Sequence, residues 1–278
     1  MSSLPQIVVS QSDQTPKHPV SVFSRAGLKC LRDSLRMPVY LSSDNLASLN
    51  VKCSEIDVNG GTPKDEGLKV LKLKSLDEMN AIAEANKLIN ADAIGPFGDY
   101  SAGNWHSSYT VALFYRSLLD EHSEVSVNAP RLLGKSLPEY SPWELSEERT
   151  VEFVTPSAIH WRACLILHPR DKSKPDSMCF LTNEASLKDG EVLSSELWCI
   201  FRLGKRQLEK KEYRNHKIAP VTVVSGSGRD LRVVQGYVDG ADHVILRMSR
   251  IINIDNENRQ QNLEGLMIIG RWLFGDPV

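Results

Sequence analysis

The chain has 278 residues, of which 41% are hydrophobic and 24% are charged, and its formal net charge at pH 7 is −2. These are ordinary globular values, which exclude a fibrous chain and a chain that is disordered throughout. A charge this close to zero also gives no global field that favours nucleic acid or an anionic membrane.

The five cysteines are scattered, and no two of them have the two-residue spacing of a zinc or thioredoxin-like motif. We interpret them as reduced and mostly buried thiols. The N-terminal residues are too polar for a signal peptide, and no apolar run approaches the ~20 residues that span a bilayer. We therefore expect an intracellular protein that has no membrane partner, cytoplasmic, with the nucleus as the alternative.

Residues 1–20 are rich in Ser, Gln and Pro, and we expect a disordered tail there. The remainder, 21–278, is expected to form a single α+β domain. Leucines at helical spacing predict a helix over 24–36, and a short strand is expected at 37–43.

Alternation of apolar residues and lysines predicts a strand over 68–73. A capping-box pattern, Ser75 followed by Glu78, predicts the start of a helix over 75–90. A second helix is predicted over 105–121, because its apolar residues follow the i, i+3, i+4, i+7, i+8 template.

Residues 128–148 contain three prolines and become acidic toward their end. This segment is the best linker candidate, so a split into two lobes stays open there, as does a long surface loop within one domain. Strands are then predicted at 151–154, 158–168 and 178–182.

A helix of about seven turns is predicted over 189–214, with Val192 and Leu193 among its core residues. Gly204 lies in its middle at a cost of roughly 1 kcal/mol against Ala, which indicates close packing against a neighbour. A final helix over 262–274 is apolar on nearly every side and is expected to pack against the rest of the domain.

Between these helices, a β-meander is predicted at about 218–225, 231–238 and 243–252, separated by the reversal signals GSGRD and DG. In its last strand Val244, Leu246, Met248 and Ile252 are expected to share one face, opposite Arg247 on a partly solvated face. The elements together predict an α+β fold with a mixed or antiparallel sheet and a C-terminal β-meander flanked by helices.

The order helix, three strands, helix resembles the core of PD-(D/E)XK nucleases. Those enzymes hold a divalent metal with an acidic residue on one strand and a carboxylate-x-Lys pair on the next. Here the third strand has no carboxylate and no lysine, and Asp230 belongs to the preceding turn. We expect the nuclease-like order without the catalytic pattern, and no metal site.

The GSG at 226–228 joins two strands, so it is interpreted as a hairpin turn and not as a phosphate loop. No dinucleotide fingerprint, G-x-S-x-G or H-E-x-x-H motif is present, and no cofactor is expected. Cys164 and His168 are expected on one face of a strand, but roughly 13 Å apart, which is too far for them to act together.

The first candidate site is the cluster of cations at the end of the long helix. Seven lysines and arginines lie within 202–217, offset by Glu209 and Glu212. Such a stripe suits an acidic protein surface or nucleic acid, although Tyr213 is the only aromatic residue within it. A solvated helix face whose cations complement the macrodipole explains the same residues. The candidate binding residues are Arg202, Lys205, Arg206, Lys210, Lys211 and Arg214.

The second candidate is the loop GNWHSS, which combines a tryptophan, a histidine and hydroxyls, as a small-molecule site does. Its candidate pocket residues are Trp105, His106 and Tyr109. A helix-capping loop with a packed tryptophan explains the same residues. Farther on, His160 and Arg162 alternate along a strand and are interpreted as a surface ladder.

The segment that runs from ELWCIFRLGK to VVQGYVDG contains a helix that begins near Glu196, a strand of the type I-x-P-V-x-V-x-S and a strand over 232–240. With the closing RWLFGDP it resembles the C-terminal part of uncharacterised proteins from filamentous fungi, over about a third of the chain. The resemblance implies a fungal intracellular protein and no particular activity.

The sequence therefore favours an accessory or interaction protein with a basic helical face and no recognisable catalytic motif. The alternative is a small-molecule enzyme of an unfamiliar family, with its pocket near Trp105 and His106. A degenerate nuclease-like protein is the third option.

Overall fold

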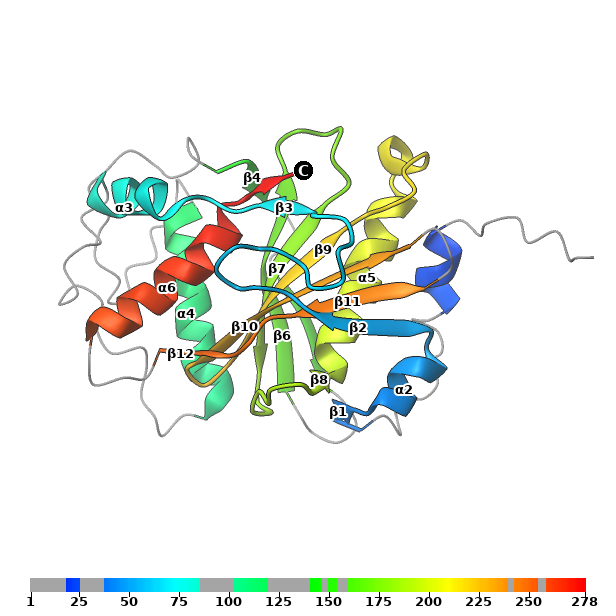
Figure 1. Ribbon diagram of the computed structural model, residues 1–278, viewed down its shortest axis with the longest axis horizontal. Coiled ribbons are helices and arrows are strands. Elements are labelled where there is room, and N and C mark those ends of the chain that lie inside the picture. The colour runs from blue at the N-terminus through cyan, green and yellow to red at the C-terminus, as the bar shows by residue number, and fades with distance from the viewer. Residues whose placement is uncertain are drawn as a thin grey trace, which may run out of the picture.

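A mixed sheet of nine strands forms the centre of the fold, and helices cover both of its faces (Figure 1). The α+β class predicted from the sequence is therefore confirmed. None of the helices among the described residues is long and apolar enough to cross a membrane. The structure is a computed structural model, and it describes residues 19–25, 38–85, 103–119, 141–146, 150–154, 160–239, 243–254 and 259–278.

Seven strands follow one another across the sheet, and two more pair beside this path. The order is β2 (Val51–Glu55), β11 (Val244–Met248), β10 (Asp230–Val238), β9 (Val221–Ser227), β7 (Ser177–Asn183), β6 (His160–Pro169) and β4 (Trp143–Leu145). The additional strands are β12 (Ile252–Asn253), beside β10, and β5 (Thr150–Val154), beside β6.

Adjacent strands are antiparallel except for β2 with β11 and β7 with β9. Parallel strands need a crossover, and α5 (Ser194–Glu209) supplies the one between β7 and β9. The 3₁₀ turn η3 (Lys211–Tyr213) follows α5. Two short ladders lie outside the main sheet: β1 (Tyr40–Leu41) with β8 (Val192–Leu193), and β3 (Leu71–Lys72) with β13 (Asp276–Pro277).

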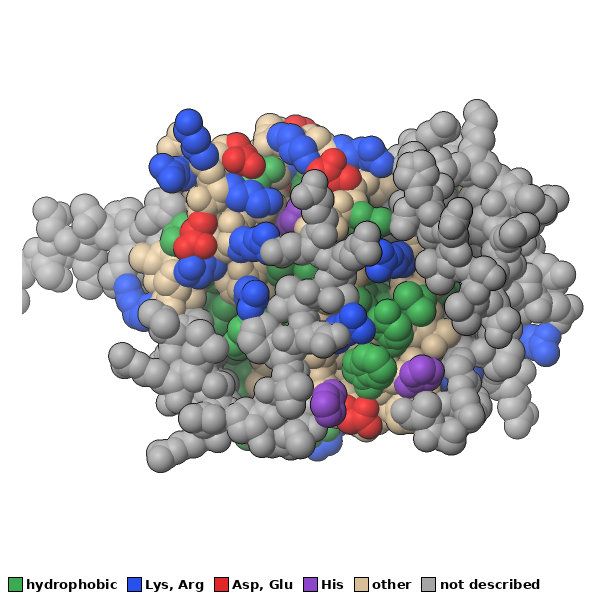
Figure 2. Space-filling model, turned by 180° about the vertical axis from the view of Figure 1, so that it is seen from behind, with side chains coloured by type: hydrophobic (Ala, Val, Ile, Leu, Met, Phe, Trp, Pro, Cys, Tyr) green, Lys and Arg blue, Asp and Glu red, His purple; other side chains and the backbone are tan. Residues whose placement is uncertain are grey.

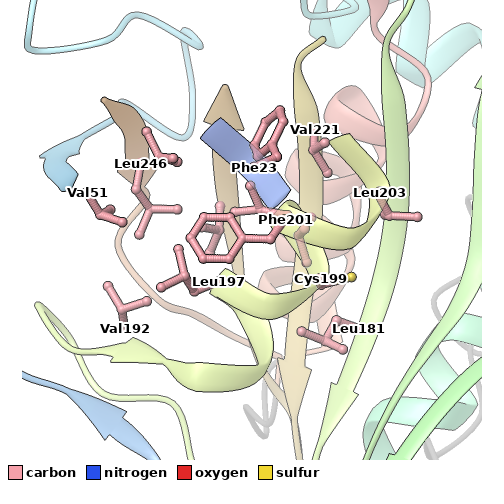
Figure 3. Close-up of a cluster of buried hydrophobic side chains, with 14 of the residues drawn as sticks. Phe23, Val51, Leu181, Val192, Leu197, Cys199, Phe201, Leu203, Val221 and Leu246 are labelled. Carbon is pink, nitrogen blue, oxygen red and sulfur yellow. The ribbon is translucent and has the colours of Figure 1, made fainter. Parts of the chain in front are cut away.

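Alternation along the strands fills a separate core on each face of the sheet. On β7, Met178 and Phe180 enter one core, whereas Cys179 and Leu181 enter the other. The first core packs against α3 (Leu76–Ala85), α4 (Asn104–Leu119) and α6 (Arg259–Leu273). The second packs against α5, α2 (Ser43–Ser48) and the helical segment 19–25 (Figure 3).

The long predicted helix is shorter than expected at both ends. Val192 and Leu193 form β8 instead, because they pair with β1, and α5 begins at Ser194. It ends at Glu209, since Lys210 adopts an extended backbone with ψ of 141°. The close packing predicted at Gly204 is confirmed: a methyl group there would lie 2.6 Å from Cζ of Phe23.

The last strand of the meander also differs from its prediction. Val244, Leu246 and Met248 share the core beneath α5, but Ile252 lies in the opposite core, because the chain bends after β11 and β12 pairs with the far end of β10. The face expected to be partly solvated is closed at Arg247.

Asp65 is what closes that face. Its carboxylate accepts two hydrogen bonds from the Arg247 guanidinium, both 2.9 Å long, and Arg247 also donates to the carbonyl of Leu68 at 2.6 Å. This contact holds residue 68 in a loop with 49% of its side chain exposed, so the predicted 68–73 strand shrinks to β3.

Several predictions fall outside the described residues. The tail up to residue 18, most of the 24–36 helix, the end of the 75–90 helix after residue 85 and the linker candidate up to residue 140 are among them, whereas residues 19 and 20, expected in the tail, are helical. Within the described part of that candidate, Trp143 on β4 packs in the same core as Tyr115 of α4. The capping box is confirmed, because the Ser75 N–H donates to the Glu78 carboxylate and the Glu78 N–H donates to the Ser75 hydroxyl.

Candidate functional site

Helix α5 carries the predicted basic residues, and its buried side decides which of them face solvent. Its first turn is anchored by Glu196, whose carboxylate accepts hydrogen bonds of 2.8 and 2.6 Å from the guanidinium of Arg232 on β10. Neither side chain is more than 1% exposed. This ion pair and the packing of Gly204 on Phe23 fix the rotation of the helix about its axis, so the cations point outward.

The outward side of α5 continues into η3, and the hairpin between β6 and β7 lies beside it. Gln207 connects the two segments, because its Nε2 donates to the carbonyl of Asp176 at 2.9 Å. Both segments carry half-buried or exposed cations, which gather on the side of the molecule seen in Figure 2. We call this set the basic face: Arg170, Lys172, Lys174, Arg202, Lys205, Arg206, Lys210, Lys211 and Arg214.

The pKa values show that the two segments form one region of positive potential. The pKa of Lys210 is lowered first by burial and further by Arg206 and Lys172, while the carboxylates of Glu212 and Glu144 oppose this shift. The pKa of His168 falls to about 4, through burial and then through Lys210 and Lys172. His168 is therefore neutral at physiological pH, chiefly because of its burial, and cations from both segments add to the effect.

The carboxylates on this surface weaken its positive charge only in part. Lys205 pairs with Glu209 and Lys172 with Glu144, and all four side chains are substantially exposed. Exposed pairs of this kind contribute about 0–1 kcal/mol, so a ligand anion can replace either carboxylate at little cost. Burial raises the pKa of Asp176 to about 7 against the lowering effect of Lys174, so this carboxyl is partly protonated at neutral pH.

Aromatic rings near α5 are used within the fold. Tyr213 is 2% exposed, with the Lys210 ammonium 5.9 Å from its ring centroid. Trp198 packs edge-on against Trp161, and the guanidinium of Arg202 covers it at 5.1 Å. The basic face is therefore a charged surface without a ring that is available for stacking among its described residues.

The second candidate site lies at the start of α4. The predicted 105–121 helix is confirmed as α4, which begins at Asn104, so Trp105 and His106 belong to its first turn and not to the loop that was the alternative for GNWHSS. The rings of Trp105 and Tyr109 stack with centroids 5.3 Å apart and planes within 5° of parallel. Arg162 of β6 places its guanidinium 5.2 Å from the Tyr109 centroid. We call Trp105, Tyr109 and Arg162 the aromatic stack.

The rings of the aromatic stack are not fully buried in a core, and they do not cap the helix. Trp105 and Tyr109 are half-buried, and His106 beside them is exposed. The capping role belongs to Glu184, whose carboxylate accepts the Trp105 N–H at 3.2 Å, where the helix dipole favours a negative charge.

The remaining sequence predictions have simpler outcomes. A β-bulge after Cys164, with Leu165 at φ of 53°, shifts the alternation of β6. Cys164 therefore lies in the core under α4, whereas His168, after the bulge, faces the α5 side of the sheet. The prediction that the two residues share a face was wrong.

Within the described ranges, no three His, Cys, Asp or Glu side chains gather as metal ligands do.

The interpretation of GSG as a hairpin turn is confirmed. Ser227 and Asp230 pair across the reversal, and Gly228 between them has a φ of 60°, which favours glycine. Asp230 opens β10 and accepts a hydrogen bond of 2.7 Å from Asn253, so its side chain holds β10 to β12.

Sequence reasoning missed four residues of these sites. Arg170, Lys172 and Lys174 stand in the segment PRDKSKPD, which was recognised only as a charged turn. The density of cations in that turn was a usable signal, but nothing local connects it with a helix thirty residues later. Arg162 was interpreted as part of a surface ladder with His160.

Comparisons with known proteins identify no relative. No family model matches the sequence, and neither a curated protein nor a solved structure matches the chain.

Proposed function

We propose that the protein is an intracellular interaction protein that binds a negatively charged partner on the basic face. The observation that carries the proposal is the convergence of two segments: the β6–β7 hairpin and the end of α5 with η3 present their cations side by side. The free thiols of the four described cysteines fit the reducing environment of the cell interior.

The helix dipole does not account for this convergence. Its preference for cations falls off within the last turn of a helix, so it explains Arg206 on α5 but not Lys172 or Lys174 on a hairpin. Bringing like charges together costs free energy: the pKa of Lys210 is lowered first by burial, and Arg206 and Lys172 lower it further. A partner of opposite charge recovers that free energy on binding.

The test is charge reversal on the basic face with two defined polyanions as probes, polyglutamate and a single-stranded oligonucleotide. Binding is measured by fluorescence anisotropy at 50 and 200 mM salt for the wild-type chain and for Lys172→Glu, Arg206→Glu and Lys210→Glu combined. We expect at least one probe to bind with an affinity that falls steeply with salt, and the variant to lose that binding.

The matched control reverses three exposed lysines elsewhere, Lys52, Lys69 and Lys72, which changes the net charge by the same amount. It should retain binding. Equal losses of binding in the two variants would mean that only the net charge matters, which would contradict a specific binding surface. Failure of both probes to bind the wild-type chain would refute the proposal.

A further inference from the structure

The geometry points to single-stranded nucleic acid as the partner, held by phosphate contacts on the basic face and by a base stacked on Trp105 in the aromatic stack. This inference rests on the proposed function and specifies the chemistry of its partner.

The aromatic stack is a ready platform for one more planar ring. Trp105 and Tyr109 are four residues apart on α4, so they lie one above the other on the same side of the helix. The Arg162 guanidinium and the Trp105 ring both lie against Tyr109, and Trp105 is half-buried, so part of it is accessible to a ligand. A base that stacks on an aromatic side chain adds about 1–3 kcal/mol of binding and does so without sequence preference.

Arg162 gives the stack a positive charge, because its guanidinium lies 5.2 Å from the centroid of the Tyr109 ring. His106, next to Trp105, and His160, on β6, are both exposed. Glu184 is the opposing carboxylate, but it is committed to the N-terminus of α4.

The stack and the basic face lie at opposite ends of β6, with α4 and α5 on opposite faces of the sheet. Figure 2 shows lysines and arginines across the upper and left part of one side of the molecule, and histidines with hydrophobic side chains lower down. Arg162 stands near the start of β6 and Arg170 just past its end, and residues 163–167 between them are buried. Eight residues of strand span roughly 26 Å, which suits a ligand of several nucleotides.

An acidic protein surface would use the basic face but gives no role to half-exposed stacked rings. A single strand of nucleic acid carries phosphates and unpaired bases along the same chain, so it engages both regions at once. A duplex keeps its bases stacked internally and has no free ring for Trp105.

The experiment titrates the full chain with a fluorescein-labelled 12-nucleotide single strand, its duplex and polyglutamate, at 100 mM salt. We expect the single strand to bind most tightly, and Trp105→Ala to weaken it about 5- to 150-fold while leaving polyglutamate unaffected. Trp105→Phe, which keeps a ring, should retain most of the affinity. Leu68→Ala, at an exposed apolar position away from the stack, is the matched control and should change nothing.

A second readout does not depend on the stability of the alanine variant. Stacking of a base on Trp105 should quench part of the intrinsic tryptophan fluorescence, and Trp105→Phe should abolish that quenching while the strand still binds. Tight binding of polyglutamate or of the duplex, with no effect of Trp105, would overturn the inference and leave the proposed function standing. Absence of binding by every probe would overturn both.

Discussion

The ion pair between Glu196 and Arg232 is expected to be the most sensitive electrostatic contact among the described residues. It joins the first turn of α5 to β10 and is at most 1% exposed, so water cannot solvate either charge if its partner is removed. The perturbation is a pair of single substitutions, Glu196→Leu and Arg232→Met, and their combination. Each single change leaves a buried charge, whereas the double change leaves none.

The magnitude follows from the contacts that are lost. Two charge-assisted hydrogen bonds, 2.8 and 2.6 Å long, join the two side chains, and bonds to charged groups contribute about 1.5–3 kcal/mol each. Their sum, about 3–6 kcal/mol, agrees with the roughly 3–5 kcal/mol by which breaking a buried pair destabilises proteins. Either single variant should therefore lose a large part of a total stability of about 5–15 kcal/mol.

Urea denaturation followed by circular dichroism measures these differences. The double variant should be more stable than either single one, because apolar side chains of similar volume replace a buried pair at little cost. Glu209→Leu, which breaks the exposed pair with Lys205, is the control and should cost about 0.3–0.5 kcal/mol. Single losses near that control value, or a double variant that loses the sum of the two singles, would refute the reasoning.

Three further outcomes are expected. Gly204→Ala should lower the melting temperature, although Ala favours a helix by about 1 kcal/mol, because its methyl group would lie 2.6 Å from Cζ of Phe23; a higher melting temperature would contradict this packing. Burial raises the pKa of Asp176 from 3.8 to about 7, so the stabilisation by its protonated form is complete below pH 3.8 and is lost as the pH rises through 7. Asp176→Asn should thus gain up to roughly 4 kcal/mol relative to wild type between pH 4 and pH 8 in denaturant titrations, and a constant difference would argue against it. The thiols of Cys179 and Cys199, 3.4 Å apart and buried, should react with Ellman's reagent only after denaturation, and rapid labelling of both in the folded chain would be inconsistent with their burial.

Neighbouring residues were sufficient to predict a structural feature wherever one residue type strongly favours one backbone geometry. The Ser75–Glu78 capping box, the turn at Gly228 and the packed glycine at position 204 were all identified from neighbouring residues alone. Helix and strand types were predicted well in the second half of the chain, because alternating or 3.6-residue periodicity is strong there.

Predictions from the sequence pattern were wrong where contacts with distant residues determine the secondary structure or the burial of a side chain. Val192 and Leu193 look helical in sequence, and pairing with β1 makes them a strand. Arg247 appears solvent-facing from the alternation of β11, yet Asp65, nearly two hundred residues earlier, closes over it. Strand β2 was missed, because its exposed residues carry no alternation and its place beside β11 comes from a long-range parallel pairing.

Composition and periodicity are local properties, so the α+β class, the basic end of α5 and the grouping of Trp105, His106 and Tyr109 could be predicted from the chain alone. The addition of the β6–β7 cations to those of α5, and the contact of Arg162 with Tyr109, became visible only in the folded molecule. The physical reason is that sheet register and the crossover of α5 bring these segments together, and both depend on long-range pairing and packing that no single stretch of sequence encodes.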